Sequence, residues 1–158
     1  MVKKTVKFII VLICMLSIFL FSSDNGDEST RKSDGIIINM CNIFMKNKIN
    51  SENKTKFINR YVFFVRKTAH FTIFLLLGVS LISLVKEYMI INYKSLLFAL
   101  FIAIIYACSD EVHQLFVIGR SARILDVFID SFGSLFGITI YYLFYVWRNK
   151  NEQKKAIS

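Results

Sequence analysis

Ionisable side chains gather at one end of three long apolar runs, where a lipid bilayer would make them costly. They are Arg66, Lys67 and His70 near the start of one run, Asp110 and Glu111 at the end of the next, and Asp126 and Asp130 at the start of the last. Ionisable groups at membrane depth are usually paired, and they often mark a functional site. We therefore expect the chemistry of this chain at that end of the runs.

The charges near this end balance each other. The cations are Arg66, Lys67, Arg120 and Arg123, and the anions are Asp110, Glu111, Asp126 and Asp130. Desolvated charges persist only when they are paired and hydrogen-bonded, so a balanced set indicates a partly buried polar pocket. Gln114 follows Asp110 by about one helical turn and would face the same pocket.

The last apolar run carries two carboxylates and two glycines on one stripe. Asp126, Asp130, Gly133 and Gly137 stand at offsets of 0, 4, 7 and 11 residues, which place them on one helix face. The two glycines form a small-xxx-small pattern that lets another helix approach closely. We expect the two carboxylates to point into a helix bundle. The glycine face would pack against another helix of the same chain or against a second copy in a homo-oligomer.

The composition favours membrane-spanning helices over a soluble fold. The chain has 158 residues, is 55% hydrophobic with a mean hydropathy of +0.53, and contains no proline. This length suits one domain covering residues 1–158. The net charge of +9 does not indicate a nucleic-acid partner, because the basic residues are scattered among membrane-length apolar runs.

Four apolar runs are long enough to cross a bilayer as helices. They lie at about residues 6–22, 61–85, 89–110 and 124–147. The first run follows a basic start, as the apolar part of a cleaved signal peptide would. It lacks a good signal-peptide cleavage site, so we interpret it as a retained membrane anchor. Residues 36–49 have apolar side chains at helical spacing, which predicts a short helix in the first extracytoplasmic loop that lies in the membrane interface or packs over the outer end of the bundle. The expected fold is all-α and polytopic.

The distribution of basic residues predicts the orientation. Lys3, Lys4 and Lys7 precede the first run, and Arg148 and Lys150 follow the last. Basic residues near span ends favour the cytoplasm, so both termini are expected there and the polar pocket outside. The long first loop is also rich in Lys and Arg, but long loops follow the charge rule less strictly.

Three short blocks resemble the motifs of the VanZ-like family over about residues 6–147. The blocks are Lys67-x-x-His70, then Asp110-Glu111-x-x-Gln114 with Gly119-Arg120, and then Asp126-x-x-x-Asp130-x-x-Gly133. Many members have a proline before the Gly-Arg pair, where this chain has Ile118. The resemblance implies a small bacterial membrane protein of the cell envelope. The family is named for a member associated with resistance to the glycopeptide teicoplanin.

Three roles for the polar pocket follow from its residues. Its arginines and lysine suit the phosphates of membrane lipids or of a lipid-linked cell-wall precursor. The acids with His70 and His113 would suit a metal- or acid/base-dependent enzyme acting on such a lipid or precursor. The charges would otherwise only neutralise one another and fix helix register. The residues favour binding over catalysis, and no cofactor or metal is expected because no zinc motif is present.

Overall fold

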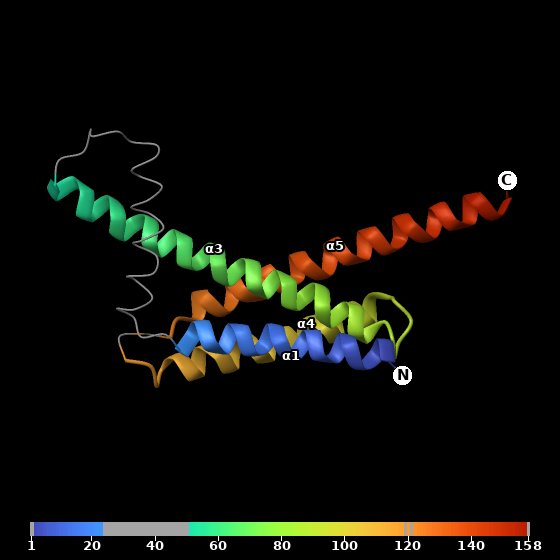
Figure 1. Ribbon diagram of the computed structural model, residues 1–158, viewed down its shortest axis with the longest axis horizontal. Helices are drawn as coiled ribbons and strands as arrows, with labels where there is room; N and C mark the ends of the chain where they lie inside the picture. The colour runs from blue at the N-terminus through green and yellow to red at the C-terminus, as the bar shows by residue number, and fades with distance from the viewer. Residues whose placement is uncertain (1, 24–50, 119, 121, 158) are drawn as a thin grey trace.

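The computed structural model describes residues 2–23, 51–118, 120 and 122–157, and their side chains except those of 51–63, 66, 156 and 157. Four helices make up the described chain (Figure 1): α1 (Val2–Ser23), α3 (Ser51–Val85), α4 (Tyr93–Gln114) and α5 (Ile124–Ile157). All four are long and apolar enough to cross a membrane, and the described residues contain no strand. The protein is therefore an all-α, multi-pass membrane protein. The interfacial helix expected at 36–49 lies outside the described residues.

The helices alternate in direction along the bundle. The chain ends in Figure 1 both lie at the end where α1 begins and α5 finishes. The opposite end collects the carboxyl ends of α1 and α4 and the beginning of α5. Since the ionisable residues cluster at the ends of these helices, this topology brings them to one end of the bundle.

The most extensive helix contact joins α3 and α5, which run in the same direction and cross each other. Gly133 and Gly137 on α5 lie so close to α3 that an added Cβ would meet the carbonyl oxygens of Phe71 and Leu75. Gly78 of α3 lies equally close to the backbone of Ser134. Backbones without side chains between them allow this approach. The α3–α5 contact fixes the height at which the two helices present their polar side chains.

Small side chains also line the buried face of α4. Ser95, Ala99, Ala103 and Ala107 are fully buried at four-residue intervals, and Glu111 continues the row. Asn92 begins the helix, because its side chain accepts hydrogen bonds from the N–H groups of the first turn. The row of small residues lets α4 pack closely and delivers its acidic end to the bundle interior.

Polar contacts hold α1 against the bundle along its length. Near the termini, the ammonium of Lys7 donates to the Ser83 carbonyl at 3.0 Å and pairs with Glu87. The hydrogen bond from Lys7 lowers the pKa of Glu87 below its ordinary value of 4.5. Halfway along, Tyr106 of α4 donates to the Met15 carbonyl at 2.6 Å. These contacts set the position of α1 and of Ser22 near its end.

Candidate functional site

Polar side chains from all four helices meet at the end of the bundle opposite the termini. We call this group the polar cluster; its members are Ser22, Lys67, His70, Asp110, Glu111, Gln114, Arg120, Asp126 and Asp130. Asp110, Glu111, Gln114 and Asp130 are buried. The side chain of Arg66, which the sequence also places here, lies outside the described residues. The polar cluster is where the sequence predicts a pocket.

Asp110 links α1 to α4. Its Oδ2 accepts a hydrogen bond from the Ser22 hydroxyl at 2.8 Å and another from the Gln114 amide at 2.9 Å. Asp110 is 4% exposed and Ser22 is fully buried. A buried carboxylate requires such donors, because burial without them would be costly. The two bonds therefore fix the position of Asp110.

Glu111 organises the segment between α4 and α5. Its Oε2 accepts the backbone N–H of Arg123 at 2.8 Å, and its Oε1 lies 3.4 Å from the Gln114 amide nitrogen. The side chain of Arg123 is exposed. Arg120 donates from Nη2 to the carbonyl of Phe21 at 2.8 Å, and its Nη1 lies 3.5 Å from Gln114. The α4–α5 connection is thus tied both to α4 and to the end of α1.

Lys67 of α3 forms an ion pair with Asp126 in the first turn of α5. The pair is largely shielded, with side-chain exposures of 22% and 14%. A carboxylate in the first turn is also favoured by the helix dipole. The pair joins α3 to α5 above the glycine contacts.

Asp130 lies one turn deeper and faces His70. The Nδ1 of His70 is 3.9 Å from Oδ2 of Asp130, which is too long for a hydrogen bond. Asp130 is 2% exposed, and its Oδ2 has no hydrogen-bond partner among the described residues. One potential metal-ligating atom from each of His70, Asp110 and Asp130 lies within 4.8 Å of the other two. This is the part of the polar cluster with the chemistry to hold a cation.

His113, considered above as a catalytic or metal-binding partner, lies elsewhere. Its ring stacks on Phe19 with centroids 4.4 Å apart, and Nε2 is 3.0 Å from the Ser23 hydroxyl. Residue 113 therefore helps dock α1 on α4. Sequence reasoning did not single out Ser22 as a site residue. The available signal was the Phe21-Ser22-Ser23 stretch after the first apolar run, which also fits the family resemblance.

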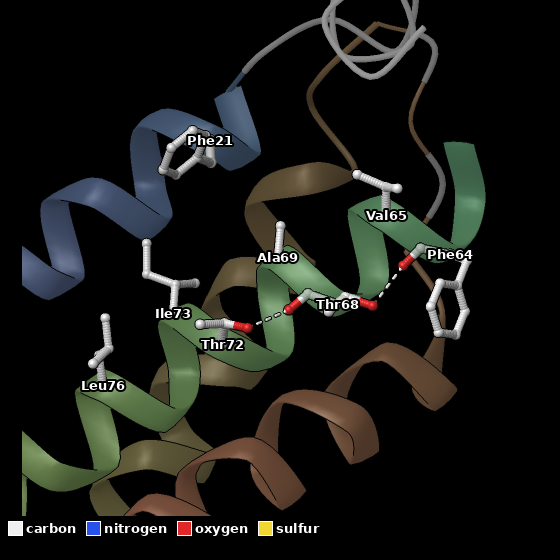
Figure 2. A pocket seen from close by; sticks show the side chains of 8 residues that line it. All are labelled: Phe21, Phe64, Val65, Thr68, Ala69, Thr72, Ile73 and Leu76. Carbon is white, nitrogen blue, oxygen red and sulfur yellow. Dashed lines mark hydrogen bonds between the residues drawn. The ribbon is translucent and has the colours of Figure 1, made fainter. Parts of the chain in front are cut away.

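An apolar groove runs between α1 and α3 beside the polar cluster (Figure 2). It is lined by Phe21 of α1 and by seven residues of α3: Phe64, Val65, Thr68, Ala69, Thr72, Ile73 and Leu76. Both threonine hydroxyls donate to carbonyls of their own helix, so the lining presents almost only carbon. The backbone carbonyl of Phe21, one of the lining residues, accepts a hydrogen bond from Arg120 of the polar cluster.

Comparison with known proteins identifies one related family. A family model described as VanZ/LLP1 matches residues 8–145. No curated protein and no solved structure matches the chain. The match covers all of α3 and α4 and most of α1 and α5, and it includes every described member of the polar cluster.

Proposed function

The chain belongs to the VanZ/LLP1 family, and from this premise we propose that it binds a membrane lipid or a lipid-linked cell-wall precursor beside its polar cluster. The observation that carries the proposal is the position of the groove. The apolar groove between α1 and α3 includes Phe21, whose backbone carbonyl accepts a hydrogen bond from Arg120. Apolar walls that include a residue bonded to a guanidinium group suit an acyl or prenyl chain with an anionic head group.

The chemistry of the two parts is complementary. Phe21, Ile73 and Leu76 offer contacts to a hydrocarbon chain, whose burial there would be driven by packing. Arg120 and the exposed Arg123 lie near the bundle end, where a phosphate would sit. A guanidinium contacts phosphate through two parallel N–H groups, which gives strength and direction.

The proposal extends to the place of the protein in the cell. We infer a multi-pass protein of the bacterial plasma membrane with both termini in the cytoplasm and the polar cluster facing outward. The basic residues at both chain ends support this orientation. By gathering precursors at the outer surface, the protein would contribute to glycopeptide resistance of the teicoplanin type.

Site-directed labelling tests the orientation. In a cysteine-free background, Ile118→Cys lies in the α4–α5 connection and Asn151→Cys lies near the end of α5. A membrane-impermeant maleimide added to intact cells should label position 118 and spare position 151. Labelling of both positions after lysis is the control. The opposite pattern in intact cells would show that the polar cluster faces the cytoplasm.

Blocking the groove tests lipid binding. Thr72→Trp places a large ring among the groove-lining side chains. We expect it to weaken binding of a polyprenyl phosphate to the delipidated protein about tenfold, or by about 1.4 kcal/mol, as measured by native mass spectrometry. Arg120→Gln removes the cation together with the hydrogen bond to the Phe21 carbonyl, and it should weaken binding of the phosphate more than binding of the uncharged polyprenol.

Thr139→Trp is the matched control for the groove. Thr139 is an exposed threonine on α5 whose hydroxyl donates to the carbonyl four residues earlier, as that of Thr72 does. We expect the binding of this variant to stay close to that of the unsubstituted protein. Equal binding by the variants at positions 72 and 139, with both folded, would rule out the groove as the lipid site.

A further inference from the structure

We propose that His70, Asp110 and Asp130 bind one divalent transition-metal cation of the zinc or manganese type. The three residues come from three helices, α3, α4 and α5, and their donor atoms lie within 4.8 Å of one another. Residues so far apart in sequence meet here because of the α3–α5 and α4–α5 packing. The proposal does not depend on the lipid groove, which uses other side chains.

Asp130 supplies the strongest reason for a cation. Its side chain is almost completely buried, and its Oδ2 lacks a hydrogen-bond donor among the described residues. An ionised carboxylate buried in this way is strongly destabilising unless a positive charge compensates it or the group takes up a proton. The same oxygen lies 3.9 Å from the His70 ring nitrogen, so it faces one of the other two residues of the site.

Carboxylates gather around Asp130. Lys67 pairs with Asp126, one turn nearer the end of the bundle. Around Asp130, the other acids on facing elements are Asp110 and Glu111 of α4, both of them buried. The interior of the polar cluster is therefore rich in carboxylate oxygen, which attracts a metal ion.

Asp110 is already oriented as metal-ligating carboxylates usually are. Ser22 and Gln114 both donate to its Oδ2 at hydrogen-bond distance. Hydrogen bonds of this kind from outside the ligand set fix the direction of a ligating carboxylate and support metal affinity. The polar cluster thus contains both the proposed ligands and residues that hold one of them in place.

The spacing and the atom types indicate which metals fit. Bonds of about 2.1 Å around a tetrahedral ion would place ligand atoms about 3.4 Å apart. The distance of 3.9 Å between Nδ1 of His70 and Oδ2 of Asp130 exceeds this by about half an ångström, a difference that side-chain rotation can remove. One imidazole nitrogen with two carboxylate oxygens favours Zn²⁺ or Mn²⁺ over Mg²⁺ and Ca²⁺, which prefer oxygen alone.

Metal binding to the full chain in detergent tests the proposal. The protein, purified through a histidine-free tag and stripped with a chelator, is dialysed against ZnCl₂ or MnCl₂, and bound metal is measured by elemental mass spectrometry. We expect one equivalent of at least one of the two metals. Asp130→Asn and His70→Gln should each weaken binding at least about tenfold. Glu152→Gln, which neutralises an exposed acid on the same helix as Asp130 far from the polar cluster, is the matched control and should keep the affinity of the unsubstituted protein.

A spectroscopic measurement tests the same site even where Asp130→Asn or His70→Gln fails to fold. The chain contains two histidines, so an imidazole coupling seen by pulsed electron paramagnetic resonance of bound Mn²⁺ comes from His70 or His113. Retention of that coupling in His113→Gln assigns it to His70. Failure of the folded, unsubstituted protein to bind either metal would overturn the proposal. So would undiminished binding by folded Asp130→Asn and His70→Gln, or loss of the imidazole coupling in folded His113→Gln.

Discussion

Replacing Gly137 with alanine should destabilise the folded bundle by about 1–3 kcal/mol, the cost of overpacking a tight contact. The added Cβ would meet the carbonyl oxygen of Leu75 and lie 3.2 Å from the backbone nitrogen of Val79. Because the obstacle is the backbone of α3, no rotamer change can relieve it, and the helices must separate. At an unobstructed helix position the same substitution stabilises by about 0.5–1 kcal/mol, so the expected sign is reversed.

The free energy of unfolding, measured by steric trapping in micelles, checks this expectation. Thr139→Ala is the matched control, since it gives alanine two residues along the same helix at an exposed position. Its effect should stay within about 0.5 kcal/mol. A Gly137→Ala variant as stable as this control would mean that α3 and α5 are not in close backbone contact.

Reversing the charge of Lys67 should have an effect of similar size. Lys67→Asp would place a second carboxylate opposite Asp126 and should cost about 2–3 kcal/mol, somewhat less than in a fully buried pair. The double variant Lys67→Asp with Asp126→Lys should recover at least half of this loss. Recovery should be incomplete, because a lysine in the first turn of α5 opposes the helix dipole.

An exposed ion pair on the same helix provides the comparison. Arg148 and Glu152 form a pair with side-chain exposures of 67% and 62%. Arg148→Asp should therefore change the free energy of unfolding by less than about 1 kcal/mol. If Lys67→Asp were equally mild, or if the double variant were no better than the single one, the Lys67–Asp126 pair would not hold α3 to α5.

The features predictable from sequence were those that repeat along a single helix. Long apolar runs require helices in lipid, so the all-α, four-span fold could be inferred from hydropathy. The α5 stripe from Asp126 to Gly137 needed only the helical period. These inferences involve neighbours in sequence, for which geometry is nearly fixed.

Contacts between helices could not be predicted in the same way. Helical spacing alone does not tell whether Arg66 or Lys67 faces Asp126, because the answer depends on the rotation of α3 against α5. The bond from Ser22 to Asp110 and the groove beside Phe21 depend on where α1 docks. The proximity of His70, Asp110 and Asp130 requires three helices to be placed at once.

The pairing of α3 with α5 has a consequence for biogenesis. Chain segments emerge from the ribosome in order, so α3 reaches the membrane before α5 has been synthesised. During that interval Lys67 lacks its acid, and Gly78 has no helix against which to pack. The pairing of Lys67 with Asp126 and the close packing of Gly78 are achieved together only when α5 inserts. A chain truncated before Ile124 would thus expose a lysine whose acid is missing and an unpacked glycine face, which membrane quality-control proteases could recognise.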